Sequence, residues 1–207
     1  MENTPLPGRN VLVNGVEYFI HGLVHGNPWI KINPSFKEVV AEKLKHVNVL
    51  CEDGFVSWIP NSVSMEESEY FGFGKMSFQE RVLFLSSFIC KYLFSLNEHE
   101  DSEIIHKIRK MSSLDDLIEI RKNLFVSYPK EPFGINALMS GANSGAIDNP
   151  QGSIPLRVRR YIYEAKTSLR YAEEKKLDRL HLVVGCAHEL PLEYLLSNKE
   201  ILDRYSL

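Results

Sequence analysis

The chain has 207 residues, of which 44% are hydrophobic and 25% are charged, an ordinary composition for a soluble globular protein with one sizeable core. Its 24 basic and 27 acidic residues give a formal net charge of −3, so the sequence lacks the general basic field that a nucleic-acid partner needs. Three widely spaced cysteines, Cys51, Cys90 and Cys186, lie in apolar runs. They favour thiols in a reducing, cytoplasmic compartment over a disulfide framework.

The N-terminal residues 1–10 contain no apolar segment and no small-residue cleavage site, so a secretory signal is not expected. The longest apolar stretch, residues 82–96, is short for a membrane span and contains Lys91. It predicts a buried helix, with attachment to a membrane surface as the alternative. No integral membrane span is expected.

The first predicted unit is a β-hairpin. Residues 11–13 and 16–24 are rich in β-branched and aromatic side chains, and the Asn14-Gly15 pair between them is typical of a type I′ turn. The second strand leads directly to His25.

A helix and a further strand follow the hairpin. Ser35 and Glu38 have the spacing of a capping box and predict a helix to about Lys45, since apolar residues then recur at helical spacing. Residues 47–51 form a short apolar strand. A strand–helix–strand unit almost always joins parallel strands, so strands 16–24 and 47–51 should end at the same edge of a sheet.

The middle of the chain has a different character. Residues 77–126 show helical apolar spacing, with start signals at Asp101 and at Ser113 to Asp116, and predict a helical insertion within a single domain of residues 1–207. Residues 129–155 are rich in Gly, Pro, Asn and Ser and are long for a connector. We interpret them as either a mobile flap over a site or a disordered surface loop.

The last part of the chain predicts a long helix and a strand. Pro155 suits the first turn of a helix that runs to about Lys176, and residues 180–184 form an apolar strand. The fold class expected is therefore α/β, with a central mixed, partly parallel sheet flanked by helices.

Two tetrapeptides of the form Gly-x-x-His each end a β-prone run, namely Gly22-Leu23-Val24-His25 and Gly185-Cys186-Ala187-His188. Glycine allows the backbone to turn sharply, and the histidine then lies just beyond the sheet. An acidic residue, Glu52, directly follows the strand at 47–51. His25, Glu52 and His188 are thus expected to form one site at the C-terminal edge of the sheet.

This pattern resembles the TraB/PrgY, TIKI and ChaN superfamily, to which erythromycin esterase-like proteins are related. Its members carry a Gly-x-x-His motif at each end of the domain, an acidic residue after the next strand, and an arginine-bearing helix before the second motif. Here Arg157-Val158-Arg159-Arg160 precedes the second motif, and the order fits along nearly the whole chain. The resemblance implies an α/β fold with a hydrolase-like site that includes Arg160. Metal-dependent proteolysis is proposed for the TIKI branch, and other branches are unassigned or regulatory.

The residue types agree with that chemistry in two ways. Neutral imidazoles and a carboxylate suit a divalent metal such as Zn, Mn or Co that keeps open positions for water and substrate. Without a metal, one histidine can act as a general base held by Glu52, while Arg160 stabilises a developing oxyanion. Both readings remain open at this point.

Each candidate residue also has a structural interpretation. His25 and His188 can be strand-end histidines bonded to the backbone, and Glu52 can cap the following loop. His21 is on the same strand face as His25, and we interpret it as a core histidine rather than a second ligand. Cys186 resembles a small buried cysteine more than a nucleophile.

The function expected from the sequence is a metal-dependent hydrolase that acts on a peptide or ester bond. A metal-independent, esterase-like hydrolase that uses His and Glu is one alternative. The other is a non-enzymatic regulatory or ligand-binding protein of the same fold. It is favoured by Tyr161 after Arg160, where the family usually has an acidic or amide residue. The expected partner is a peptide or a small-molecule substrate.

Overall fold

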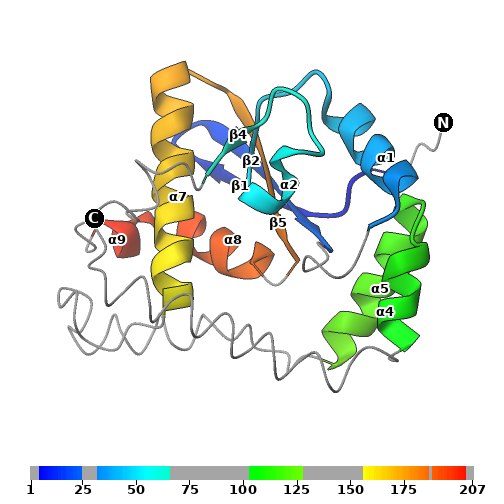
Figure 1. Ribbon diagram of the computed structural model, residues 1–207. Helices are drawn as coiled ribbons and strands as arrows, with labels where there is room; N and C mark the ends of the chain where they lie inside the picture. The colour runs from blue at the N-terminus through cyan, green and yellow to red at the C-terminus, as the bar shows by residue number, and fades with distance from the viewer. Residues whose placement is uncertain (1–4, 25–31, 66–102, 128–155, 187, 204–207) are drawn as a thin grey trace, which may run out of the picture.

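The computed structural model describes residues 5–24, 32–65, 103–127, 156–186 and 188–203 (Figure 1). In these residues five strands form one sheet in the order β1-β2-β5-β3-β4, in which β1 is antiparallel to β2 and the other neighbours are parallel. The predicted α/β fold with a mixed, partly parallel sheet is confirmed. The strands are β1 (Arg9–Val13), β2 (Val16–Leu23), β3 (Val49–Cys51), β4 (Val63–Ser64) and β5 (Arg179–Gly185).

Helices cover both faces of this sheet. They are α1 (Pro34–Leu44), α2 (Asp53–Val56), α4 (Glu103–Lys110), α5 (Leu114–Ser127), α7 (Leu156–Lys175), α8 (Glu189–Ser197) and α9 (Lys199–Leu202). In Figure 1 the sheet lies between α7, α8 and α9 on one side and α1, α4 and α5 on the other. The described residues therefore form a three-layer α/β/α arrangement.

The alternation of side chains along each strand accounts for the two layers. One face of the sheet carries Tyr18, Ile20 and Leu50 and packs against α7, α8 and α9. The opposite face carries Leu23 and Val183 and packs against α1, α2, α4 and α5. Because helices cover both faces of the sheet, most residues of β5 are apolar, as is typical of central parallel strands.

The predicted hairpin is confirmed. Val13 pairs with Val16, and the two residues between them have the positive φ angles that a type I′ turn needs, 51° at Asn14 and 83° at Gly15.

The parallel relation of the strands on either side of α1 is also confirmed, with one addition. β2 and β3 are not neighbours, because β5 lies between them and pairs in parallel with both. All three strands therefore end at the same edge of the sheet.

Of the four predicted helix starts, two agree with the structure, one is wrong, and the one at Asp101 lies outside the described residues. α5 begins after Ser113, whose Oγ accepts the backbone N–H of Asp116, while the Asp116 carboxylate accepts the Ser113 N–H in return. α7 covers nearly the whole range expected from Pro155 to Lys176. The predicted capping box of α1 is wrong: Asn33 is the N-cap, its side chain accepts the Ser35 N–H, and Pro34 takes the first helical position.

Several predicted segments lie outside the described residues. They are the apolar stretch 82–96, the loop 129–155 and residues 77–102 of the helical insertion. The described end of that insertion, α4 and α5, packs on the sheet through Ile108, Leu114 and Leu117. Among the helices that the structure describes, none has the length and apolar composition needed to cross a membrane.

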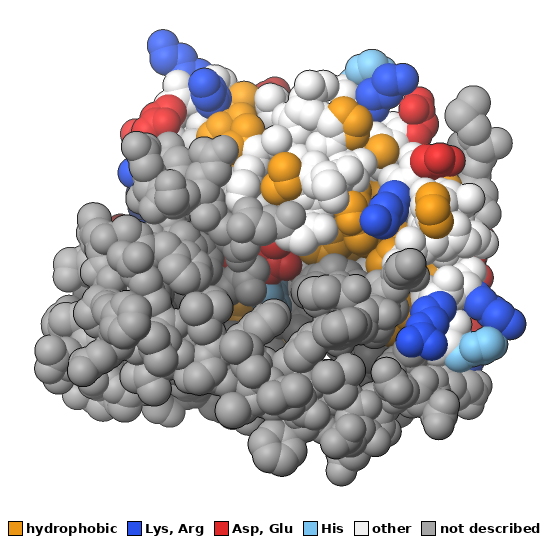
Figure 2. All heavy atoms as spheres, in the orientation of Figure 1, with side chains coloured by type: hydrophobic (Ala, Val, Ile, Leu, Met, Phe, Trp, Pro, Cys, Tyr) orange, Lys and Arg blue, Asp and Glu red, His pale blue; other side chains and the backbone are white. Residues whose placement is uncertain are grey.

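The surface charge is unevenly distributed on the face shown in Figure 2. Lysine and arginine side chains lie mainly around the periphery, whereas an acidic side chain lies beside a histidine near the centre.

Candidate functional site

Glu52 is placed by the end of β3. Its backbone N–H donates to the Val183 carbonyl at 3.0 Å, so the sheet pairing continues through this residue. Since Cys51 faces the α1 side of the sheet, alternation turns the Glu52 side chain toward α7 and α8. There it is buried, and its Oε2 accepts the backbone N–H of Gly185 at 2.7 Å. Glu52 is thus held by the neighbouring strand at a fixed position.

A turn after β5 places His188 beside Glu52. Its backbone N–H donates to the Gly185 carbonyl at 2.8 Å, and the residue forms the N-cap of α8. The ring then packs edge-on against Tyr161 of α7, with centroids 5.2 Å apart. Nδ1 of His188 forms an ion-pair contact with Oε1 of Glu52. Two residues singled out by the sequence, 136 positions apart by their numbers 52 and 188, are therefore in direct contact.

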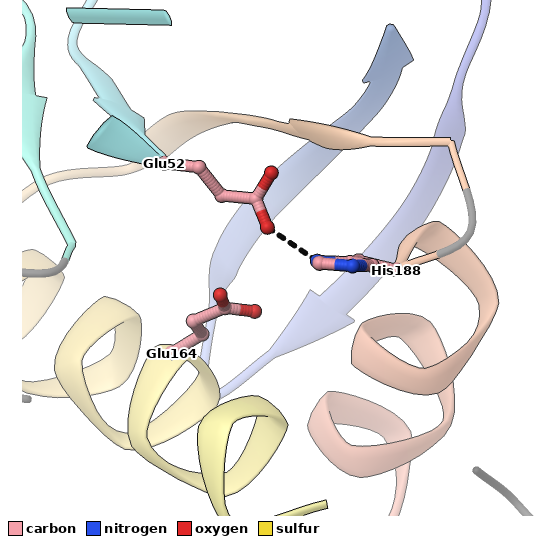
Figure 3. A group of neighbouring side chains, drawn as sticks. All are labelled: Glu52, Glu164 and His188. Atoms are coloured by element: carbon pink, nitrogen blue, oxygen red, sulfur yellow. Dashed lines mark ion pairs between the residues drawn. The ribbon is translucent and has the colours of Figure 1, made fainter. Parts of the chain in front are cut away.

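A third side chain completes the group. Glu164, on the inner face of α7, is fully buried, and ligand-type atoms of Glu52, Glu164 and His188 all lie within 4.8 Å of one another. Figure 3 shows the Glu164 carboxylate extending from α7 toward the other two side chains. The three residues come from the end of β3, from α7 and from the start of α8, at the C-terminal edge of the parallel strands.

Sequence reasoning missed Glu164, although a signal was present. Three of its neighbours on α7 are buried as well: Tyr161, three residues before it, Ala165, directly after it, and Ser168, four residues after it. A carboxylate within the buried stripe of an amphipathic helix is exceptional, because charged side chains are seldom buried without a partner or a metal.

The other predicted site residues are placed only in part. His25 lies outside the described residues. Arg160 belongs to α7, four residues before Glu164, and its side chain is outside the described part of the chain.

The motif glycines have a different role from the one expected. Gly22 and Gly185 are inside β2 and β5, where Gly22 pairs with Val184 and Leu23 pairs with Gly185, and neither glycine has a positive φ. A turn does follow Gly185, whose carbonyl accepts the His188 N–H, but it needs no glycine-only conformation at Gly185, and Gly22 continues the strand. Gly185 also donates its N–H to Glu52.

The donor set of this site fits a divalent cation. Carboxylate oxygens and an imidazole nitrogen are the ligands of Zn²⁺, Mn²⁺ and Co²⁺ in proteins. Two carboxylates held close together in a buried environment repel each other unless a cation or a proton offsets their charge. His188 keeps 14% of its side chain exposed, whereas Glu52 and Glu164 are buried.

Comparison of the chain with models of known protein families, with curated proteins and with solved structures gave no match.

Proposed function

We propose that this protein is a metal-dependent hydrolase that acts on a peptide or ester bond and belongs to the TraB/PrgY, TIKI and ChaN superfamily. The cation would be held by Glu52, Glu164 and His188, with His25 as a further ligand. Arg160 would stabilise the developing oxyanion. The observation that carries the proposal is the convergence of three ligand-type side chains from three separate elements at one edge of the sheet. Ligand sites of open α/β sheets lie at this edge.

Each residue has a defined task in this proposal. When bound, a divalent cation lowers the pKa of a coordinated water toward neutrality and polarises a carbonyl group. Glu52 is held by the Gly185 N–H and in turn orients the His188 ring through Nδ1. Glu164 supplies a second negative charge from the opposite side of the group, which favours a divalent over a monovalent cation.

A metal-free hydrolase is the second candidate, and the Glu52–His188 contact favours it. A carboxylate on Nδ1 fixes the tautomer of the imidazole and leaves Nε2 to exchange a proton with a substrate or water. A cytoplasmic location is part of both candidates. It is supported by Cys51 and Cys186, which form no disulfide among the described residues.

Metal uptake is the first test. Protein purified without chelator or affinity-tag histidines should bind one equivalent of Zn²⁺, Mn²⁺ or Co²⁺ by calorimetry. Glu164→Gln and His188→Ala should each weaken binding by more than about 100-fold, since even outer partners of metal ligands contribute about 10- to 100-fold. His106→Ala, at an exposed position of α4, is the matched control and should bind like the wild type. Unchanged uptake in both site variants would reject metal ligation.

Turnover on a panel of peptides and esters separates the remaining candidates. At a metal concentration that saturates each variant, Glu52→Gln should fold normally and lose about 10²- to 10⁴-fold in rate, the range expected for a group that takes part in proton transfer. Hydrolysis that persists at full rate with chelator would select the metal-free candidate. Ligand binding without any hydrolysis would select the regulatory binder.

A further inference from the structure

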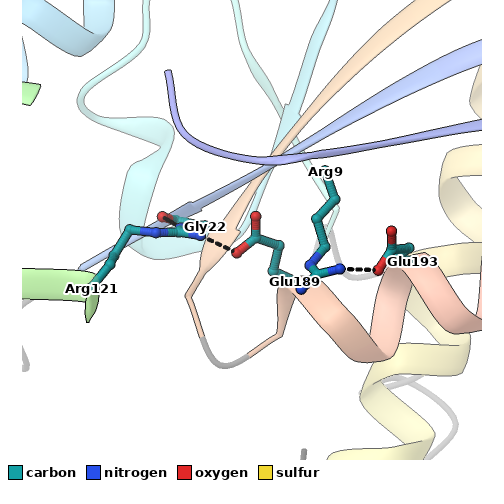
Figure 4. Close-up of polar contacts among 5 residues, drawn as sticks. All are labelled: Arg9, Gly22, Arg121, Glu189 and Glu193. Atoms are coloured by element: carbon teal, nitrogen blue, oxygen red, sulfur yellow. Dashed lines mark hydrogen bonds and ion pairs between the residues drawn. The ribbon is translucent and has the colours of Figure 1, made fainter. Parts of the chain in front are cut away.

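A partly buried arginine of α5 connects the two Gly-x-x-His segments. Nη1 of Arg121 donates to the carbonyl of Gly22, and Nη2 donates to Oε2 of Glu189 at 2.7 Å. Gly22 opens the first motif, three residues before His25, and Glu189 directly follows His188 of the second. Figure 4 shows the guanidinium lying beside Gly22 and directed at Glu189. We call this set, Arg121, Gly22 and Glu189, the arginine clamp.

From this geometry we infer that Arg121 is a positioning residue that fixes both histidine-bearing segments relative to each other. In its metal-binding aspect the inference rests on the proposed function. Arg121 belongs to the layer of α1, α4 and α5, whereas Glu189 begins α8 in the opposite layer. The clamp therefore reaches across the end of the sheet, next to the site.

Gly22 makes room for the clamp. A Cβ on this residue would lie 2.6 Å from Arg121 Nη1, 2.6 Å from Glu189 Oε2 and 2.9 Å from Cys186 Cα. All three distances are shorter than real Cβ contacts. The first motif glycine is thus required by the close approach of a guanidinium group, and this requirement replaces the sharp turn that the sequence suggested.

The clamp acts on His188 through the backbone. His188 is the N-cap of α8 and Glu189 is its first residue, so a displacement of the Glu189 side chain is transmitted directly to the histidine. Arg121 and Glu189 keep only 13% and 2% of their side chains exposed, which shields the pair from water and from screening by salt. Two directed donors from one planar group set an orientation that a lysine, with a compact point charge, cannot reproduce.

The test compares Arg121→Lys with Arg9→Lys. Arg9 forms an ion pair at 2.6 Å with Glu193, one turn further along α8, and its side chain is 43% exposed, which makes it a matched control (Figure 4). The first readout is the ¹⁵N spectrum of the histidine rings, which does not depend on metal. Arg121→Lys should shift the ring signals of His188, and Arg9→Lys should leave them unchanged.

The second readout is the site itself. Arg121→Lys should weaken Co²⁺ binding by about 10-fold or more and alter the visible absorption spectrum of the bound Co²⁺, as expected for a partner that orients ligands. Glu189→Gln, which keeps the size of the side chain and one acceptor oxygen, repeats both measurements in case Arg121→Lys does not fold.

The outcomes separate the two proposals. Unchanged ring signals of His188 in a folded Arg121→Lys protein overturn the positioning role. Shifted ring signals in a protein that binds no metal support the positioning role and reject the metal-dependent hydrolase. A loss of thermal stability with an unchanged Co²⁺ spectrum and affinity would show that the clamp only joins the layers, and it also overturns the inference.

Discussion

His21 and His181 form a contact between imidazole rings, away from the Glu52 group. His21 Nε2 and His181 Nδ1 are 2.9 Å apart, and the ring of Phe19 stacks on His181 with centroids 4.7 Å apart. His21 is buried on the sheet face that also carries Leu23, which agrees with its interpretation as a core histidine. Burial, together with His181 and Arg121, lowers the pKa of His21 to about 4, against an opposing backbone hydrogen bond at Pro7.

This depressed pKa predicts a loss of stability in mild acid. The unfolded chain binds a proton at His21 near its ordinary pKa of about 6.5, whereas the folded protein does so only near 4. The contribution of neutral His21 is therefore fully present above about pH 6.5 and is lost as the pH falls toward 4, on the order of 3 kcal/mol in total.

Urea unfolding between pH 7.5 and 4.5 measures this effect. The wild type should lose stability more steeply than His21→Gln over that range. His46→Gln, at an exposed position after α1, should follow the wild type. Parallel curves for the wild type and His21→Gln would contradict the assignment.

Elements that depend on near neighbours in sequence were predictable, and elements that depend on distant contacts were not. The hairpin turn at Asn14-Gly15 and the start of α5 at Ser113 are set by residues within a few positions of each other. The start of α1 was misassigned because Asn33 and Ser35 compete as caps, and Pro34 decides in favour of Asn33 by suiting the first helical position.

Gly22 of β2 lies so close to Arg121 and to the start of α8 that one added methyl group should lower the stability of the protein. Gly22→Ala should destabilise the protein by about 1–3 kcal/mol, the usual cost of overpacking, because the new Cβ displaces the guanidinium of Arg121 and meets the Cα of Cys186. Gly54→Ala is the control. Nothing lies within 4 Å of a Cβ there, and alanine favours helix α2.

Thermal or urea unfolding of the two alanine variants measures the difference. Equal stability of Gly22→Ala and the wild type would show that the clamp can move aside without cost. That result would remove the structural reason for the glycine.

At the scale of the whole molecule, the candidate site is an outcome of sheet order. The sequence predicted that β2 and β3 end at one edge, and this placed Glu52 correctly relative to the strands. It did not predict that β5 lies between them, and this insertion brings Gly185 and His188 against Glu52. Glu164 meets Glu52 across 112 positions, from 52 to 164, and Arg121 meets Glu189 across 68. No local pattern specifies such contacts.

A cation held by β3, α7 and α8 should stabilise the whole fold, since its ligands meet only when those elements are packed together. At a free concentration about 100 times its dissociation constant, a ligand of the folded state alone adds about 2.7 kcal/mol. For a chain of this size that corresponds to a rise of roughly 5–10 °C in Tm.

Calorimetric melting of wild type, Glu164→Gln and His106→Ala with and without Mn²⁺ measures this rise in Tm. Wild type and His106→Ala should show the full rise, and chelator should reverse it, whereas Glu164→Gln should show almost none. Stoichiometric binding without any rise in Tm would mean that the cation binds the unfolded chain equally well, which contradicts a site built from three packed elements.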